Sequence, residues 1–144
     1  MSLTEFPPLF VKLDKDATLP TRAHATDAGL DIYSTECKII KAHSGDVVKT
    51  GTHIKLPEHT AGLLVSKSGL NVRHNITSTG LIDEGYSGEI MVKLYNHGDV
   101  DYTIQKGDKI SQLVIIPVLY SNVVMCETIE GSERGDSGFG STGK

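Results

Sequence analysis

Short hydrophobic stretches alternate with turn-forming residues along most of the chain. Breakers such as Ser44-Gly45-Asp46 interrupt the apolar residues at short intervals. Short strands with frequent breakers are typical of sandwiches, jelly rolls and barrels. We therefore expect an all-β domain, with strands at residues 9–13, 30–33, 47–54, 61–66, 89–95, 110–119 and 123–125.

Two of these stretches predict how their strands are buried. In the stretch that ends at residue 95, Ile90, Val92 and Leu94 recur at every second position. A period of two places them on one face of a half-buried strand. Residues 110–119 are nearly all apolar and β-branched, which predicts burial on both faces.

Spacing typical of a helix is nearly absent, with one exception. Ser66 and Ser68 offer hydroxyl caps ahead of the apolar Leu70 and Val72. A hydroxyl residue before an apolar step marks a helix start, so we expect one short helix to begin at Ser68.

The end of the chain differs in composition from the rest. Residues 131–144 contain five glycines and three serines, but one aromatic residue, Phe139. Such a composition favours a mobile segment over a packed one. We therefore divide the chain into a β-barrel domain, residues 1–130, and a glycine-rich flexible C-terminal arm, residues 131–144.

Length and charge narrow the classes of function. The 144 residues suit one domain with its own core. The net charge is −4 and the basic residues do not cluster, so we expect no nucleic-acid-binding surface. The sequence has no leader-like N-terminus and no stretch near the roughly 18 apolar residues of a membrane span. We expect a cytoplasmic protein without membrane contact.

Cysteine and histidine spacing suggests no metal centre built by the protein. Cys37 and Cys126 lie far apart and form no CxxC motif. A reducing intracellular setting fits this pattern, and a single bridge between them remains open. The six histidines lack the spacing of zinc ligands.

Three polar residues occupy otherwise apolar contexts. Asp31 lies at the start of a strand, and Gln112 interrupts the apolar stretch that ends at residue 119. An unpaired buried amide costs about 1–3 kcal/mol, so Gln112 needs either a ligand or a neighbouring backbone group. Asp83 lies ahead of Gly85 and Tyr86 in a predicted hairpin, where it serves either a site or the turn itself. The residues alone leave both interpretations open.

The C-terminal arm carries its own candidate chemistry. Arg134 could hold a phosphate bidentately, and Phe139 could stack on a base. The glycines allow backbone N–H groups to converge on an anion. From composition alone, the alternative is a disordered terminus.

Together and in this order, five segments resemble the five motifs of the trimeric dUTPase family. They are residues 27–31 (DAGLD), 66–70 (SKSGL), 80–89 (GLIDEGYSGE), 107–113 (GDKISQL) and 134–143 (RGDSGFGSTG). The resemblance covers nearly the whole chain. It implies a jelly-roll-like β-barrel or sandwich subunit with one short helix, assembled as a homotrimer whose sites are shared between subunits.

The resemblance also implies a reaction, the hydrolysis of dUTP to dUMP and pyrophosphate with Mg²⁺. This reaction lowers dUTP, which prevents uracil incorporation into DNA, and supplies dUMP for dTTP synthesis. Asp83 would be the general base that activates a water for attack on the α-phosphorus, and Gln112 would help to hold that water. Mg²⁺ would be bound mainly by the three phosphates, and Asp31 would contact the water molecules on the ion.

The same resemblance assigns contacts to the substrate. Phosphates would meet Lys67, Ser68 and Gly69 at a helix start. Tyr86 would lie under the deoxyribose, and Met91 would line the same pocket. Uracil would be recognised, largely by backbone hydrogen bonds, along the segment that contains Thr77, Thr79, Gly80, Leu81 and Ile82. In the arm, Phe139 would stack on uracil, and the other substrate-binding residues would be Arg134, Gly140, Ser141 and Thr142.

The sequence departs from the family pattern in three places. The segment 70–82 is about one residue shorter than that pattern, which leaves open which of Thr77, Ser78 and Thr79 meets the base. Lys67 stands where the family usually has arginine, which keeps the charge but removes the bidentate fork. Ser137 stands in place of a common glycine. Two other functions remain open: a dCTP deaminase-like enzyme of the same fold, and a regulatory protein that senses the nucleotide.

Overall fold

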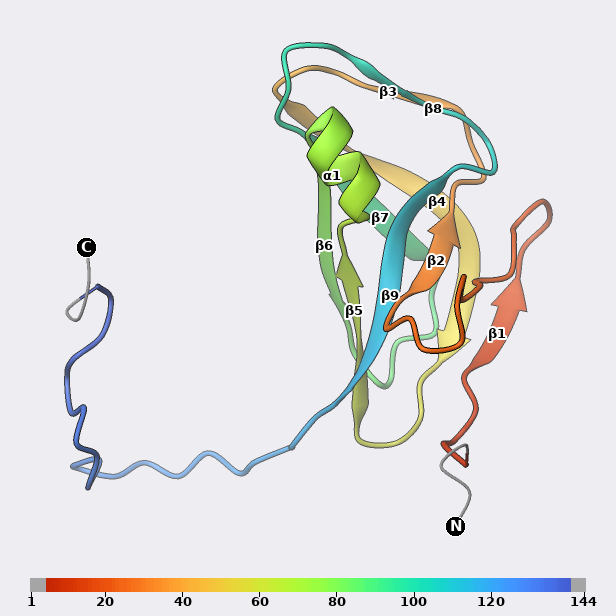
Figure 1. Cartoon of the computed structure of the whole chain (residues 1–144). Helices are drawn as coiled ribbons and strands as arrows, with labels where there is room; N and C mark the ends of the chain where they lie inside the picture. Colours follow the sequence, from red (N-terminus) through yellow and green to blue (C-terminus); the bar gives the residue numbers. More distant parts are fainter. Residues whose placement is uncertain (1–4, 141–144) are drawn as a thin grey trace.

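The computed structural model describes residues 5–140, which form antiparallel β-structure with one short helix (Figure 1). One sheet has the strand order β1-β4-β7-β6-β5-β9-β2, and β3 pairs with β8 separately. The predicted all-β, jelly-roll-like class with one short helix is confirmed. The elements are β1 (Phe10–Leu13), β2 (Leu30–Tyr33), β3 (Lys38–Ile40), β4 (Ser44–Lys55), β5 (Thr60–Val65), α1 (Ser68–His74), β6 (Ile76–Ile82), β7 (Ile90–Asn96), β8 (Tyr102–Ile104) and β9 (Lys109–Pro117).

The large sheet curls around an apolar core, as the curvature of β4 and β9 in Figure 1 shows. The predicted alternation in β7 is confirmed, because Ile90, Val92 and Leu94 are buried while Met91 between them is half exposed. Burying an aliphatic side chain of this size contributes about 1.5–3 kcal/mol. The core therefore fixes which face of each strand is left for function.

Burial on both faces of β9 is confirmed only for its first half. Ile110, Ser111 and Leu113 are buried, although they do not share one face. Val114 and Ile116 are only half buried, and the strand ends at Pro117 rather than at residue 119.

The prediction of a strand at residues 123–125 is wrong. The chain from residue 118 to residue 130 has no strand, and Val123 and Met125 are almost fully exposed at 99% and 96%. In Figure 1 this segment runs away from the sheet. A strand needs a partner for its backbone hydrogen bonds, and within residues 5–140 none lies beside this segment.

Three strands were not predicted. β3 and β8 have three residues each and pair only with one another, so neither produces a clear period along the sequence. β6 carries Thr77, Ser78, Thr79 and Gly80 between its apolar ends, and these residues resemble a loop more than a strand.

The helix prediction is confirmed, but the predicted cap is not. α1 begins at Ser68 and ends at His74, and its C-cap residue Asn75 adopts a left-handed conformation. Lys67 occupies the N-cap position without a side-chain capping bond. Ser66 instead accepts a hydrogen bond from the Ser78 N–H at 2.9 Å, which ties the helix start to β6.

Both cysteines, Cys37 and Cys126, are free thiols at the surface. Across the described residues 5–140, no helix combines the length and the hydropathy that a membrane crossing requires.

Candidate active site

A row of side chains crosses the outer face of the sheet, away from the core. In the strand registers Asp31 lies opposite Gln112, and Gln112 lies opposite Val65. Directly opposed residues point to the same face of a sheet. The next pair in the register, Leu64 and Leu113, belongs to the core, so the row faces outward.

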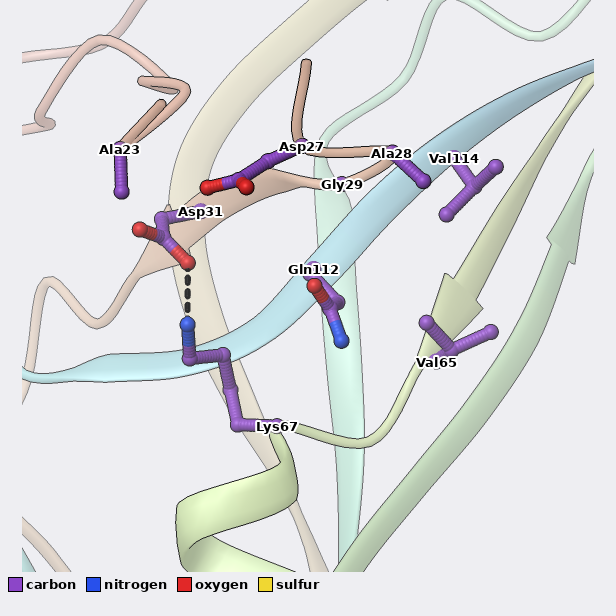
Figure 2. A pocket seen from close by; sticks show the side chains of 9 residues that line it. All are labelled: Ala23, Asp27, Ala28, Gly29, Asp31, Val65, Lys67, Gln112 and Val114. Atoms are coloured by element: carbon purple, nitrogen blue, oxygen red, sulfur yellow. Dashed lines mark hydrogen bonds and ion pairs between the residues drawn. The ribbon is translucent and has the colours of Figure 1, made fainter. Parts of the chain in front are cut away.

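A cavity of about 330 Å³ opens over this row, and we call it the Asp31 cavity (Figure 2). Its walls come from the loop before β2, from β2, β5 and β9, and from the residue before α1. In Figure 2 the Lys67 side chain reaches up from the helix start toward Asp31. The lining residues are Ala23, Asp27, Ala28, Gly29, Asp31, Val65, Lys67, Gln112 and Val114.

Asp31 is the electrostatic centre of this cavity. Its carboxylate is 5% exposed and pairs with two ammonium groups. Lys67 Nζ lies 2.5 Å from Oδ1, and Lys109 Nζ lies 3.3 Å from Oδ2. A buried carboxylate needs such partners, because removing it from water costs several kcal/mol. Asp27 lines the same cavity, so its carboxylate and that of Asp31 balance the charges of Lys67 and Lys109.

Sequence reasoning did not find Lys109, and the reason is a β-bulge. Lys109 and Gln112 are three positions apart, so a regular strand would place them on opposite faces. The β2–β9 register shifts between Ile32 and Tyr33, and Tyr33 lies opposite Lys109. The bulge lets Lys109 join Asp31; the segment 107–113 resembles a family motif, but nothing in it assigned Lys109 to the site.

Gln112 is held in place from two sides. Its Nε2 donates a hydrogen bond to the Ser66 carbonyl at 2.9 Å. A Cβ added to Gly29 would lie 2.3 Å from its Oε1, so only glycine leaves room for the amide. The backbone partner expected for this amide is therefore present, and the side chain still lines the Asp31 cavity.

The start of α1 adjoins this cavity through Lys67. Ser68 and Gly69 form the exposed first turn of the helix. A Cβ added to Gly69 would meet no atom within 4 Å. Open space and free backbone donors at a helix start suit an anion.

The hairpin between β6 and β7 carries the second group of predicted residues. Its turn closes with a hydrogen bond from the Tyr86 N–H to the Asp83 carbonyl at 3.0 Å. The Tyr86 hydroxyl donates to the Glu89 carbonyl at 2.8 Å. The hairpin with Asp83 and Tyr86 on its rim is thus as expected, and both residues are exposed.

A cavity of about 250 Å³, which we call the hairpin cavity, lies between this turn and the sheet. The β6–β7 ladder ends at the pair of Ser78 and Leu94. Beyond that pair the edge of β6 is not covered by β7, and its backbone is left for another partner. The lining residues are Leu64, Gly80, Leu81, Ile82, Asp83, Tyr86, Glu89, Ile90 and Met91.

Comparison with known proteins gives the family. The family model described as dUTPase matches residues 15–143. The chain belongs to the dUTPase family. A deoxyuridine 5'-triphosphate nucleotidohydrolase of Clostridium acetobutylicum is 46% identical over 135 residues, which covers 92% of this chain and 93% of the relative. The enzyme of the same name from Clostridium tetani is 42% identical over 145 residues, covering 99% and 100%.

Solved structures of dUTPases share the fold. The dUTPase of Staphylococcus bacteriophage 80alpha with dUPNHPP has a TM-score of 0.90 and 35% identity, covering 96% of this chain and 100% of that one. A mutant dUTPase from phage phi11 of S. aureus has a TM-score of 0.80 and 30% identity, covering 87% and 100%. That mutant is described as revealing the coordination of a structural Mg(II) ion.

Within one subunit of this dUTPase-family chain, the predicted residues fall into separate groups. Asp31, Lys67 and Gln112 line the Asp31 cavity, with Ser68 and Gly69 following Lys67 in the chain. The hairpin cavity brings together Gly80, Leu81, Ile82, Asp83, Tyr86 and Met91.

Thr77 and Thr79 line neither cavity. The Thr77 hydroxyl lies 2.7 Å from His97 Nε2, and Thr79 is exposed opposite Val65. Their contact with a base stays a prediction.

The predicted residues of the arm lie apart from both cavities. Phe139 is fully exposed, and the Arg134 Nε donates to the Ser137 carbonyl within the arm. Figure 1 shows this segment far from the sheet. Gly140 follows Phe139, while Ser141 and Thr142 lie outside the described residues.

The carboxylates beside the site differ in their surroundings. Glu84, next to Asp83, accepts hydrogen bonds from the Tyr120 hydroxyl at 2.7 Å and from the His59 N–H at 2.6 Å. These bonds lower the pKa of Glu84, and both are made to its Oε1. Asp27 accepts from the His24 side chain, which lowers the pKa of Asp27.

The donor set offers little for a metal held by protein alone. Within residues 5–140, no three side chains of histidine, cysteine, aspartate or glutamate converge as a metal site. Both oxygens of Asp31 are already paired with lysines. This arrangement fits an ion that is held mainly by the ligand and its own waters, as Mg²⁺ often is.

Proposed function

We propose that this chain hydrolyses dUTP to dUMP and pyrophosphate, at sites formed between copies of the chain. The reaction keeps dUTP low, which prevents uracil incorporation into DNA, and provides dUMP for dTTP synthesis. Membership of the dUTPase family and relatives named for this reaction support the proposal.

The observation that carries the proposal is the uncovered edge of β6 in the hairpin cavity. Gly80, Leu81 and Ile82 line it, and alternate residues of this strand turn their backbone groups to the uncovered edge, while Met91 and Ile90 supply apolar walls. Backbone N–H and C=O groups in a strand can pair with the edge of uracil and reject the donor pattern of cytosine. Tyr86 at the rim would lie under the deoxyribose, where a ribose hydroxyl would be excluded.

Asp83 is the proposed general base. A water attacks the α-phosphorus, and its proton passes to the Asp83 carboxylate as the bond from the α-phosphorus to the bridging oxygen of pyrophosphate breaks. Unlike Glu84, the exposed Asp83 is free to face a ligand in the hairpin cavity. Gln112, fixed by Ser66 and Gly29, would hold the attacking water. Positioning of this kind supplies much of the rate in phosphoryl transfer.

Lys67, Ser68 and Gly69 would bind the phosphates, because Lys67 offers an ammonium group beside the cavity and the helix start is open. Mg²⁺ would be held by the triphosphate, with Asp31 contacting its waters, and would neutralise the charge that develops on the phosphates. Lys67 must leave Asp31 to reach a phosphate, and its 27% exposure is compatible with that motion.

Strand geometry supports a site made by more than one copy. Leu64 lines the hairpin cavity and its neighbour Val65 lines the Asp31 cavity. Successive residues of a strand point to opposite faces. Asp83 and Gln112 therefore line separate cavities in one subunit, and a second copy would bring the two groups to one phosphate.

A homotrimer would also cover exposed apolar residues. Leu119, Val124 and Ile129 are 80–91% exposed in the segment that leaves the sheet. Several large apolar side chains left exposed in one segment favour a protein interface there. In the trimer, residues 131–144 would act as an arm that closes over a neighbouring site, with Arg134, Phe139 and Gly140 on the nucleotide and Ser141 and Thr142 beside them.

Pyrophosphate release from dUTP tests the reaction, with dTTP, dCTP and UTP as controls and with Mg²⁺ withheld in parallel. Asp83→Asn should lower kcat by about 10²–10⁴-fold, because a general base contributes that much. Binding of a non-hydrolysable dUTP analogue should persist. Glu84→Gln is the matched control, since the adjacent carboxylate is engaged with Tyr120, and its kcat should stay close to wild type. Turnover that survives Asp83→Asn would remove Asp83 from the mechanism.

Two other functions are separated by the same experiments. The phage 80alpha dUTPases are described as controlling the transfer of virulence genes by a G protein-like mechanism. A nucleotide sensor of that type would keep its function in Asp83→Asn, whereas an enzyme would not. Ammonia release from dCTP would identify a deaminase.

A further inference from the structure

His53 on β4 bridges two segments that lie far apart in the sequence. Its Nδ1 lies 3.0 Å from the Ser87 carbonyl oxygen in the β6–β7 hairpin. Its Nε2 lies 3.0 and 3.1 Å from the two carboxylate oxygens of Asp14, which follows β1. The side chain is 22% exposed. One imidazole ring thus connects the end of β1 to the hairpin that carries Asp83.

The His53 ring faces two hydrogen-bond acceptors, so the number of its N–H donors depends on its charge and decides whether both contacts are satisfied. A carbonyl oxygen and a carboxylate both accept hydrogen bonds, and neither can donate. A neutral imidazole has one N–H, so one of its two contacts would place a lone pair against an acceptor. The imidazolium has two N–H groups and satisfies Ser87 and Asp14 together.

The surroundings of His53 favour the charged form. The Ser87 carbonyl and then the Asp14 carboxylate raise the pKa of His53 above its ordinary value of 6.5, against smaller opposing effects of partial burial and of Lys12 on β1. On the hairpin side, Glu89 carries a carboxylate two residues after Ser87, and its Oε2 accepts from the Gly51 N–H at 2.9 Å. His53 therefore keeps its proton to a higher pH than an unperturbed histidine does.

The hydrogen bond to Ser87 acts on the rim of the hairpin cavity. Gly88, the next residue, packs so tightly on Tyr86 that an added Cβ would lie 2.4 Å from the Tyr86 hydroxyl oxygen. That hydroxyl donates to the Glu89 carbonyl, and Glu89 is tied to Gly51 in the bulge of β4. Residues 87–89 are thus bonded to β4 at two points, through His53 and through Gly51. Tyr86 packs against these residues.

We propose that His53 is a positioning residue that fastens the hairpin bearing Asp83 and Tyr86 when its ring is an imidazolium, and loosens the hairpin when the ring is neutral. The consequence for nucleotide binding rests on the proposed function, in which this hairpin holds the deoxyuridine. Because the folded pKa lies above the unfolded one, the clamp is complete in acid and is lost as pH rises through the folded pKa. The KM for dUTP should therefore rise toward alkaline pH.

The test combines an NMR titration of the His53 ring with dUTP kinetics on the full chain, between about pH 5.5 and 8.5. Wild type should show a ring pKa above 6.5 and a KM that rises several-fold through that pKa, with a smaller change in kcat. Asp14→Asn should shift both midpoints to lower pH, because it removes a charge that stabilises the imidazolium. His53→Gln should remove this inflection of KM.

His43→Gln is the matched control, since His43 pairs with Asp99 at 2.7 Å in another exposed histidine–aspartate contact and does not touch the hairpin. Its KM profile should follow wild type. A ring pKa at or below 6.5, or a His53→Gln profile that superimposes on wild type, would overturn the proposal. If His53→Gln fails to fold, the Asp14→Asn midpoint decides. If dUTP is not a substrate, the NMR titration and hydrogen exchange at Tyr86 and Gly88 still test the clamp without turnover.

Discussion

Gly29→Ala would place a methyl group where the Gln112 side chain already lies. The added Cβ would meet the Gln112 Oε1 at 2.3 Å, its Cβ at 2.9 Å and its Cδ at 3.0 Å. Gly29 is buried, so the loop before β2 has little freedom to retreat. Gln112 must rotate away, and the hydrogen bond from its Nε2 to the Ser66 carbonyl is lost.

The cost can be estimated from these contacts. Overpacking a filled site destabilises by about 1–3 kcal/mol, and the lost hydrogen bond adds about 0.5–1.5 kcal/mol. Alanine also restricts the unfolded chain, which offsets about 0.4–1 kcal/mol. We expect the free energy of unfolding to fall by about 2 kcal/mol. The kcat for dUTP should fall as well, because the displaced Gln112 amide no longer holds the attacking water.

Urea unfolding followed by circular dichroism measures this loss, at a fixed subunit concentration because association makes the midpoint depend on concentration. For slopes of about 1–3 kcal/mol per molar urea, the midpoint should drop by about 1 M with an unchanged slope. Gly69→Ala is the matched control, since its added Cβ meets nothing within 4 Å. Its midpoint should not fall.

A double-mutant cycle with Gln112→Ala separates the causes. In that background the Gly29→Ala substitution meets no amide, but the contact with the Cβ at position 112, 2.9 Å away, persists. The cost of Gly29→Ala should therefore shrink without vanishing. Equal costs in both backgrounds, or a stable Gly29→Ala protein with wild-type kcat, would refute the assigned role of this glycine.

Two further substitutions test buried charge and polarity. Lys67→Met removes the nearer cation from Asp31, so the KM for dUTP should rise by about tenfold, or about 1.4 kcal/mol. Lys67→Arg should restore the wild-type KM. Unchanged kinetics in Lys67→Met would contradict the role of Lys67 in phosphate binding. Asn96→Asp replaces an amide that donates to the Ile40 and Val100 carbonyls at 3.0 and 2.9 Å. Repulsion from those oxygens should raise the pKa of the new carboxyl in the folded state, so urea unfolding should show a larger loss at about pH 8 than at about pH 5. Equal losses of unfolding free energy at the two pH values would argue against a raised pKa at position 96.

Local pattern was enough to predict some of the fold. The alternation of Ile90, Val92 and Leu94 predicts β7, because apolar residues at every second position mark the buried face of a strand. The polarity of Asp31 and Gln112 was visible in the sequence, but their position as direct neighbours depends on the β2–β9 register. Register is set by the whole sheet, so the outer row could be recognised only in the structure.

Other features had no local signal. Lys109 reaches Asp31 through a bulge, and His53 meets Asp14 across 39 positions of sequence. A lone histidine in a strand does not indicate its partners. The apolar triplet at residues 123–125 gave the opposite error, because the prediction assumed a partner strand that residues 5–140 of one subunit do not provide.

The predicted site residues of one subunit lie in separate cavities, and this explains why the sequence predicted the residues but not how they meet. The core fixes which residues of β5, β6 and β9 face inward, and this sorting places Asp83 and Gln112 in separate cavities. A base and a water-holding amide that serve one phosphate must lie within a few ångströms of that phosphate. If the proposed function holds, the five motifs follow one another along the sequence in the family order, and yet their side chains do not meet within one chain. The exposed apolar segment after β9 supplies surface for the association that would bring them together.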